Sequence, residues 1–383
     1  MINLLALLAS ACIADGLLLQ GGGIDLYEAY SGVPGFPTCF RQPVLTVINA
    51  THYLAFAEGR DNGYCSGGAD GDNSSIWVRT SGDGGSTWTP AAMLYDAPPM
   101  PDYLSAVFDA RSGRALLFIQ TSPNLVTHSD DAGATWSKPS PINITLPHGV
   151  TASPGVAHGI QVSGALCSEP SCGGAAGRLI VAWVCHKKTP PRPIGSRSDI
   201  SCAGCYTCLA VSDDGGKTWE VGASAVSTQE GSREASLVQL PHSSHPSGTG
   251  GAVIYATQRN MGATPGHRWH SISVDSGSSL SIFGEDPSLP DVVTKNWTGI
   301  VAGAARIGET VVVSTPKAQA ERADLALFSS VDSAATWDAG QLLVQGPAGY
   351  SDMQAINGTH GAVLCENGAQ EFSGKISFFV FEV

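Results

Sequence analysis

The stretch TSGDGGSTW, from Thr80 to Trp88, joins a turn rich in Asp and Gly to a tryptophan that is large for a surface loop. Its pattern, Ser-x-Asp-x-Gly-x-Thr-Trp, returns at residues 129–136 and 212–219, and a copy at 330–337 has Ala in the Gly position. A fifth copy, SVDSGSSL at 273–280, lacks the tryptophan. Asp-Gly favours a tight hairpin turn, Ser and Thr hydroxyls can satisfy turn backbone, and the Trp can pack against its own sheet. We interpret each copy as a structural staple; the alternative is that these Asp residues are catalytic or bind calcium.

The spacing of these boxes predicts a repeat architecture. The box tryptophans stand at 88, 136, 219 and 337, giving steps of 48, 83 and 118 residues. The last step is about twice 59, and the second exceeds that period by about 24 residues. The surplus coincides with the Cys- and Pro-rich segment 185–208, which we interpret as an insertion.

Apolar runs of strand length lie between the boxes, at residues 44–47, 53–57, 115–119, 178–184, 251–256, 310–314, 324–328 and 376–383. A repeat of about 60 residues fits six times into the chain after residue 14, and no composition break divides it. The sequence therefore predicts an all-β, six-bladed β-propeller that forms one domain over residues 15–383.

Composition limits the partners. Charged residues make up 14% of the chain, the formal net charge is −13 and only 20 residues are Lys or Arg. This balance argues against nucleic acid as a partner, because phosphate binding needs an excess of clustered basic residues. An anionic ligand would have to be held by a few well-placed arginines. No later apolar run reaches the 18 residues of a membrane span.

The N-terminus and the cysteines indicate secretion. Residues 1–14 read as a signal peptide that ends near Ala14; the alternative is a buried first strand. Five Asn-x-Ser/Thr sites fit the secretory route, and we expect the one at Asn73 to be unoccupied. Nine cysteines follow residue 14, so at least one is unpaired or intermolecular, and their density indicates disulfides. Cys202, Cys205 and Cys208 could be read as zinc ligands, but no second cluster follows, so disulfides are favoured.

Further segments join the boxes in a fixed order: CFRQP (39–43), AFAEGR (55–60), SPGVAHGIQV (153–162), REASLVQL (233–240), YATQRN (255–260), RADLALFSSVD (322–332) and GYSDM (349–353). Together they resemble the sialidase (exo-α-neuraminidase) family of Asp-box glycoside hydrolases. The resemblance spans nearly the whole chain after residue 14, although Gln42 replaces an Ile of the family motif.

The resemblance implies that Arg41, Arg259 and Arg322 form the arginine triad that binds the carboxylate of a sialic acid. Planar guanidinium groups suit this task, because they present paired donors to carboxylate oxygens and keep their charge. The three residues come from distant segments that all match family motifs.

The resemblance also implies that Tyr350 is the nucleophile and Glu234 its base, with Glu230 as the alternative base. Sialidases use Tyr where other retaining glycosidases use a carboxylate. We infer that a neutral phenol avoids repulsion by the carboxylate on the reacting carbon, but a free phenol, with a pKa near ~10, needs a base beside it.

The proton donor to the leaving group is expected in the loop at 60–79. Asp70 stands at the family spacing and is favoured over Asp72, while Asp61 lies too close to the strand end. Arg60 matches a residue that contacts the far hydroxyls of the sugar, and Asp102 is a weaker candidate for that region. Glu366 matches a Glu that braces the first arginine.

We therefore expect a secreted, monomeric, retaining exo-α-sialidase that acts on sialylated glycans, glycoproteins or glycolipids through a sialyl-tyrosine intermediate. No metal or organic cofactor is implied. The alternatives are a catalytically inactive sialoglycan-binding propeller, a trans-sialidase, an enzyme that forms an anhydro sugar, and an Asp-box scaffold or receptor unrelated to sialic acid. The sequence leaves open the linkage preference, the disulfide connectivity, and whether the substituent of the nonulosonic acid is N-acetyl or hydroxyl.

Overall fold

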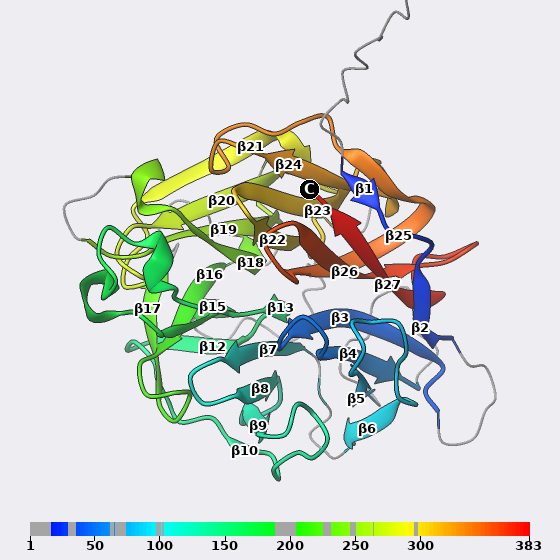
Figure 1. Cartoon of the computed structure of the whole chain (residues 1–383), viewed down its shortest axis with the longest axis horizontal. Coiled ribbons are helices and arrows are strands. Elements are labelled where there is room, and N and C mark those ends of the chain that lie inside the picture. Colours follow the sequence, from blue (N-terminus) through cyan, green and yellow to red (C-terminus); the bar gives the residue numbers. More distant parts are fainter. Residues whose placement is uncertain are drawn as a thin grey trace, which may run out of the picture.

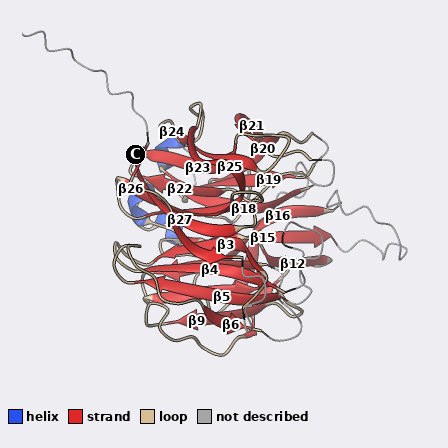
Figure 2. Cartoon of the chain, turned by 90° about the vertical axis from the view of Figure 1, so that its right-hand side faces the viewer, coloured by secondary structure: helices blue, strands red, loops and turns tan. Residues whose placement is uncertain are grey.

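A computed structural model describes residues 17–29, 36–61, 65, 74–96, 101, 103–187, 204–224, 231–245, 250–262, 264–294 and 298–383. Figure 2 shows that this part of the chain is built mainly of strands and loops. Its helices are short 3-10 turns, η1 (Gly164–Leu166), η2 (Cys172–Gly174) and η3 (His242–Ser244). The predicted signal peptide, residues 1–14, lies outside the described residues.

The strands form sheets that follow one another along the chain (Figure 1), and their strands pair antiparallel except for two short edge pairs. The first sheet contains β3 (Cys39–Val47), β4 (Tyr53–Arg60), β5 (Ser74–Ser81) and β6 (Ala92–Tyr95). The next contains β7 (Leu104–Asp109), β8 (Arg114–Ile119), β9 (Leu125–Ser129) and β10 (Ser140–Pro141), with β13 (Ala157–His158) added at its β7 edge. The third contains β11 (Ile144–Thr145), β12 (Val150–Pro154), β14 (Ile160–Gln161), β15 (Leu179–Lys187), β16 (Cys205–Ser212) and β17 (Trp219–Ser224). The fourth contains β18 (Ser232–Leu240), β19 (Val253–Asn260), β20 (His267–Ser273) and β21 (Ile282–Pro290).

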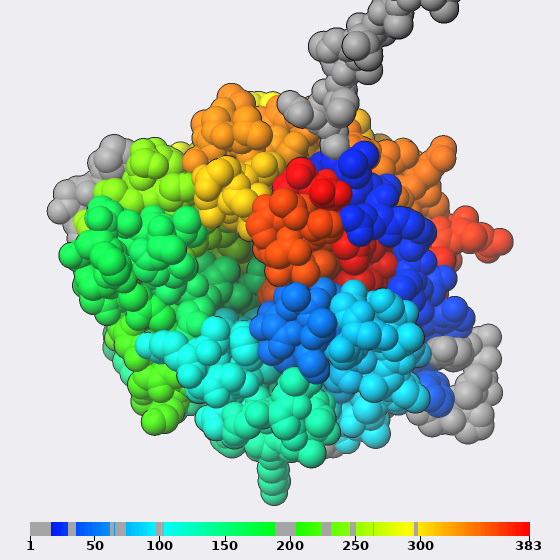
Figure 3. All heavy atoms as spheres, in the orientation of Figure 1, coloured from blue at the N-terminus to red at the C-terminus, as the bar shows by residue number. Residues whose placement is uncertain are grey.

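The last sheet has eight strands and joins both ends of the described chain. It contains β22 (Gly303–Ile307), β23 (Thr310–Pro316), β24 (Ala323–Ser330), the long β25 (Gln341–Ala355), β26 (His360–Asn367) and β27 (Lys375–Glu382). The N-terminal strands β1 (Leu18–Leu19) and β2 (Ile24–Glu28) both pair with β27. Figure 3 shows these first residues, in blue, lying against the red C-terminal strands. The ends of the described chain are thus tied to each other.

The sheets surround the middle of the molecule and pack on one another through apolar side chains (Figure 1). Phe56 of β4, for example, shares a buried cluster with Leu104 of β7 and Leu117 of β8. Each of the eight predicted apolar runs overlaps a strand. The predicted all-β, propeller-like architecture is therefore confirmed.

The Asp boxes are structural staples, as predicted. In the second box, Asp131 Oδ1 accepts hydrogen bonds from the Ser129 hydroxyl (2.8 Å) and the Thr135 amide (2.8 Å), and Oδ2 accepts one from the Thr135 hydroxyl (2.6 Å). Asp83, Asp214, Asp275 and Asp332 make the equivalent bonds in the other boxes. Each box connects the strand that ends at its Ser to the next strand of the same sheet. The carboxylates are thus occupied in holding the turns.

The box tryptophans pack on more than their own sheets. Trp88 contacts Tyr53 of its own sheet, as expected, with ring centroids 6.5 Å apart. Trp136 packs edge-on against Phe56 of the preceding sheet, with ring centroids 5.6 Å apart. Trp219 packs in the same way on Phe118 of β8, at 5.1 Å. The boxes therefore join neighbouring sheets as well as closing turns, because the turn carries the ring across the gap between sheets.

Three disulfides join pairs of described cysteines and confirm the prediction from the cysteine count, namely Cys39–Cys65, Cys167–Cys172 and Cys185–Cys208. The third excludes Cys208 as a thiolate ligand to zinc, and Cys205 is disulfide-bonded as well. Cys365 is a buried free thiol. These bonds are consistent with an extracellular protein. None of the helices among the described residues has the length and apolar character of a membrane crossing.

Candidate active site

Three arginines surround the ring of Tyr350. The guanidinium carbon of Arg322 lies 4.8 Å from the ring centroid, that of Arg41 5.3 Å and that of Arg259 5.9 Å. Arg41 belongs to β3, Arg259 to β19 and Tyr350 to β25, and Arg322 directly precedes β24. All four side chains are buried. The structure thus brings together residues that are separated by up to 309 positions in the sequence.

Local backbone irregularities stand beside the arginines. Gln42, Glu234 and Asp324 have positive φ angles of 55°, 49° and 59°, and each lies where the register of a strand pair shifts. A bulge inserts an extra residue and re-aims the neighbouring side chains. Non-glycine residues in this region of φ and ψ are strained, and such strain is concentrated at functional sites.

Glu366 of β26 ties the first arginine to the tyrosine. Its Oε1 accepts hydrogen bonds from Arg41 Nε (2.7 Å) and from the Gln42 amide (2.8 Å), and its Oε2 accepts one from the Tyr350 amide (2.9 Å). Gly349 makes this approach possible, because a Cβ there would collide with the Glu366 carboxylate and the Phe372 ring. This geometry supports the bracing role that was predicted for Glu366.

Arg259 connects the predicted base to the predicted nucleophile. Its Nη1 donates to Glu234 Oε2 at 2.6 Å and to the Tyr350 hydroxyl at 2.9 Å. Burial alone would raise the pKa of Glu234, but the charges of Arg259 and Arg233, with hydrogen bonds from Arg259 and Tyr103, lower it to about 2. Glu234 is therefore a fully buried, unprotonated carboxylate at neutral pH.

Arg322 lies between two aromatic rings. Its guanidinium carbon is 4.6 Å from the centroid of Phe372, which also covers Arg41 at 5.0 Å. Burial lowers the pKa of Arg322 to about 10; the Tyr350 hydroxyl opposes this effect, and the charges of Arg41 and Arg259 reinforce it. A cavity of about 400 Å³ borders Arg322 and Phe372. An anion placed among these cations would be strongly favoured.

Of the other predicted site residues, two are described by the structure and four are not. Arg60, at the end of β4, is buried and donates from Nε (2.9 Å) and Nη2 (2.7 Å) to Glu58 Oε2. Asp61 is exposed. The predicted acid Asp70, its alternative Asp72, the alternative base Glu230 and the weaker candidate Asp102 lie outside the described residues. Their roles stay predictions.

Sequence reasoning missed three members of the site, which are Arg233, Tyr103 and Phe372. Arg233 ion-pairs with Glu234 (Nε to Oε1, 3.1 Å) and donates from Nη2 to the Tyr103 hydroxyl at 2.7 Å. The only signal for Arg233 was its position next to Glu234, and a lone Arg at a strand start is ordinarily a surface residue. Nothing in the sequence places Tyr103 or Phe372 beside the arginines.

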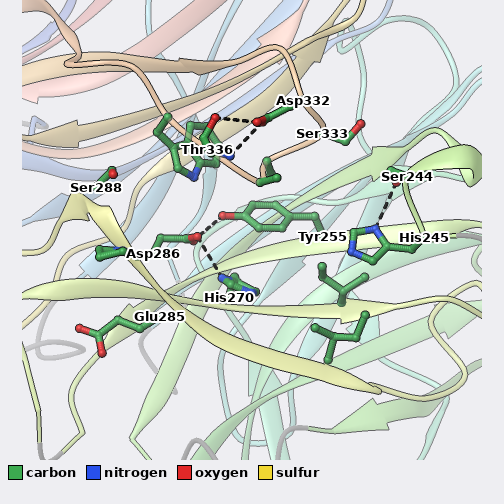
Figure 4. A pocket seen from close by; sticks show the side chains of 16 residues that line it. Ser244, His245, Tyr255, His270, Glu285, Asp286, Ser288, Asp332, Ser333 and Thr336 are labelled. Carbon is green, nitrogen blue, oxygen red and sulfur yellow. Dashed lines mark hydrogen bonds and ion pairs between the residues drawn. The ribbon is translucent and has the colours of Figure 1, made fainter.

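A separate cavity of about 570 Å³ lies between β19–β21 and the Asp box at 330–337 (Figure 4). The Tyr255 hydroxyl there donates to Asp286 Oδ2 (2.7 Å), and His270 Nδ1 is 3.0 Å from Asp286 Oδ1. Tyr255 precedes Arg259 by four residues on β19, which separates them by about 13 Å. None of the predicted site residues that the structure describes lines this cavity.

Fold and site together define a propeller-like Asp-box protein in which buried arginines surround a tyrosine and a glutamate. The sequence matches the profile of the BNR repeat-like domain over residues 53–364. Because this match covers most of the chain, the protein belongs to the BNR repeat-like domain family.

Known proteins that resemble the chain include sialidases. A sialidase of Micromonospora viridifaciens is 29% identical over 90% of this chain, which spans 53% of that protein's length. A Hadza microbial sialidase has a similar fold, with a TM-score of 0.70 and 17% identity, covering 94% of this chain and 68% of the other. The intramolecular trans-sialidase of Ruminococcus gnavus, solved with oseltamivir carboxylate, has a TM-score of 0.68 and 14% identity, covering 94% and 97%. The resemblance to the sialidase family is confirmed.

Proposed function

We propose that this protein is a retaining exo-α-sialidase, a glycoside hydrolase that releases terminal sialic acids from glycans, glycoproteins or glycolipids. One observation carries the proposal: three buried guanidinium groups stand within 5.9 Å of the Tyr350 ring centroid. Glu366 and Glu234 each offset one of these charges, and three guanidinium groups around one ring still favour an anion bound among them. The sialidase of Micromonospora viridifaciens supports the same reading.

The arginines explain why the substrate would be a sialic acid. This sugar carries a carboxylate on its anomeric carbon, so the anion is bonded to the reacting atom. Arg41, Arg259 and Arg322 present planar donor pairs that match carboxylate oxygens. Binding that carboxylate would set the anomeric carbon beside Tyr350, because the three guanidinium groups lie around its ring.

The proposed reaction has two steps. In the first, Tyr350 transfers its hydroxyl proton to Glu234 while its oxygen bonds to the anomeric carbon; the glycosidic C–O bond breaks, and the leaving oxygen takes a proton from Asp70. In the second, water attacks that carbon and gives a proton to Asp70, while Tyr350 leaves and recovers its proton from Glu234. Two displacements at the same carbon give net retention.

Cys65, which precedes the proposed acid by five positions in the sequence, lies beside the first arginine. Cys65 is bonded to Cys39 of β3, and its carbonyl accepts a hydrogen bond from Arg41 Nη1 at 2.8 Å. This supports Asp70, or alternatively Asp72, as the donor to the leaving group. In this proposal Arg60 and Asp102 contact sugar hydroxyls, and Glu366 holds Arg41.

We also propose that the fold has six blades. The strands β3, β7, β15, β18, β22 and β25 contact one another in that order, and β25 contacts β3 again. The eight-stranded sheet then divides within β25, whose first half pairs with β24 and whose second half pairs with β26. Residues 15–383 would form one domain with an insertion at 185–208. A signal peptide at 1–14 would direct the monomer to secretion.

Intramolecular transfer that forms an anhydro sugar is the second candidate. The similar fold of the Ruminococcus gnavus trans-sialidase, matched over 97% of its chain, keeps this reaction open. Mass analysis of the sugar released from sialyl-lactose separates the two, because the anhydro product is lighter by one water. Binding of a sialoside without any release would instead indicate an inactive glycan-binding propeller.

A further inference from the structure

Glu234 lies between two arginines rather than one. In the β18–β19 hairpin Arg233 stands opposite Arg259, and Glu234 occupies the bulge between Arg233 and Ala235. Arg259 Nη1 is 2.6 Å from Oε2 of Glu234, and Arg233 Nε is 3.1 Å from Oε1. Each carboxylate oxygen therefore faces a different guanidinium group.

Arg233 is held in this position from another sheet. Its Nη2 donates to the hydroxyl of Tyr103 at 2.7 Å, and its guanidinium carbon lies 5.4 Å from the Tyr103 ring centroid. Tyr103 directly precedes β7, and no more than 17% of the Arg233 side chain is exposed. Arg233 is thus fixed beside Glu234 by contacts that Arg259 does not share.

Substrate binding would change the surroundings of Glu234. In the proposed function Arg259 turns its donors to the substrate carboxylate, so its charge is shared between that anion and Glu234. Glu234 is fully buried, and a buried carboxylate without a counter-charge takes up a proton. A protonated Glu234 could not accept the proton of Tyr350.

We propose that Arg233 is a positioning residue that keeps Glu234 ionised and oriented while Arg259 binds the substrate carboxylate. The inference rests on the proposed function, because it needs Glu234 as the base and Arg259 as a carboxylate ligand. Arg233 acts through Glu234 and makes no contact with the reacting carbon. When Arg259 also binds the substrate carboxylate, it stabilises the charge of Glu234 less, and the charge of Arg233 compensates for this loss.

The groups that face Glu234 are consistent with this role. Arg233 lies on β18, the strand of Glu234, and Arg259 lies on β19. Tyr103 comes from the segment before β7. Tyr350 of β25 is linked to Glu234 through Arg259, which donates to both. Burial opposes ionisation, and the two arginines are the charges that lower the pKa of Glu234. In the free protein both arginines lower the pKa of Glu234. In the complex with substrate, Arg233 supplies the larger part of this effect.

The pH dependence of Arg233→Gln tests the inference. The acidic limb of kcat/KM reports the free enzyme, where Arg259 still pairs with Glu234, and the acidic limb of kcat reports the complex, where it is shared. Removing a charge in contact with a carboxylate shifts its pKa by about 1–3 units. We expect the acidic limb of kcat to move up by at least about one pH unit, and that of kcat/KM by clearly less. Arg233→Lys, which keeps the charge, should restore most of the wild-type profile.

Arg79→Gln is the matched control. Arg79 of β5 also covers a tyrosine ring, that of Tyr27 at 5.6 Å, but it belongs to no part of the proposed site. Its pH profiles should equal those of the wild type. If Arg233→Gln does not fold by circular dichroism, Arg233→Met, which replaces the guanidinium group with an uncharged side chain and keeps the Tyr103 hydroxyl, should give the same unequal shift.

Equal shifts of both limbs, or no shift, in a folded Arg233→Gln or Arg233→Met protein would overturn the inference. An active wild type with unshifted variants would leave the proposed function intact. A wild type that cleaves no sialoside would instead refute the proposed function itself, so the two failures are distinguishable.

Discussion

Replacing Arg322 by Lys keeps one positive charge but removes the planar pair of donors. In the structure the guanidinium lies between Tyr350 (4.8 Å) and Phe372 (4.6 Å) and is almost fully buried. A substrate carboxylate bound there would be desolvated, and truncating one partner of such a pair costs roughly 2–5 kcal/mol. Because Lys keeps the charge, we expect roughly 2–4 kcal/mol, or about 30- to 900-fold in kcat/KM.

The same substitution should introduce a new pH dependence. Burial lowers the pKa of Arg322 to about 10, and the neighbouring cations Arg41 and Arg259 act in the same direction. A lysine in this position starts from a reference pKa near ~10.4 and is lowered by the same causes. As the pH rises, a cation with a lowered pKa loses its proton and no longer forms an ion pair with the substrate carboxylate. The variant should therefore lose activity at mildly alkaline pH, where the wild type keeps it.

The test is the steady-state kinetics of purified Arg322→Lys on sialyl-lactose, which shows whether Arg322 binds the substrate carboxylate. The melting temperature of the variant is compared with that of the wild type. The melting temperature should change little, because the residue serves the substrate rather than the core. A surface arginine would change kcat/KM by less than about 0.5 kcal/mol. An unchanged kcat/KM would remove Arg322 from the proposed carboxylate site and refute the reasoning above.

Three further predictions concern the acid, the base and the Asp boxes. Asp70→Ala should impair cleavage of sialyl-lactose far more than cleavage of an activated aryl sialoside, whose leaving group needs little proton assistance; if Asp72→Ala shows this selective loss instead, Asp72 is the acid. Glu234→Gln should fold normally but slow formation of the intermediate, and a normal burst in rapid kinetics would point to Glu230. Asp131→Ala should lower the melting temperature by a few degrees without changing kcat per folded molecule. Hydrogen bonds from Thr135 and Ser129 lower the Asp131 pKa to about 2, so its stabilisation is present above the unfolded pKa near ~3.9 and fades as pH falls through about 2. Melting curves between pH 2 and 7 should show the difference from the wild type narrowing below pH 4, and a constant difference would contradict this.

The sequence predicted features whose causes are local. The Ser, Asp and Thr of each box are close in sequence, and their hydrogen bonds could be foreseen from the turn that they share. The apolar runs marked strands for the same reason, since alternation and length depend on neighbouring residues. Arg41, Arg259 and Arg322 could be grouped only through their resemblance to a family, because nothing local relates three distant strands.

Features set by long-range packing were not predicted. The pairing of β1 and β2 with β27 joins residues about 350 positions apart, and the short runs involved carry no signal of their partner. The contact of Trp136 with Phe56 of the neighbouring sheet was not predicted, because it depends on the distance between the two sheets. The contact of Arg233 with Tyr103 depends on how two sheets are placed. The positive φ of Glu234 belongs to a bulge, and the sequence has no glycine at that position that would have predicted it.

Mass analysis of the sugar released from a panel of sialosides, by the wild type and by Tyr350→Phe, tests the central claim most directly. The wild type should release free sialic acid, and the variant should be slower by at least about 10³-fold in kcat, as expected for the loss of a nucleophile. Failure of the folded wild type to release any sialic acid or anhydro sugar, or near wild-type turnover by Tyr350→Phe, would contradict the account.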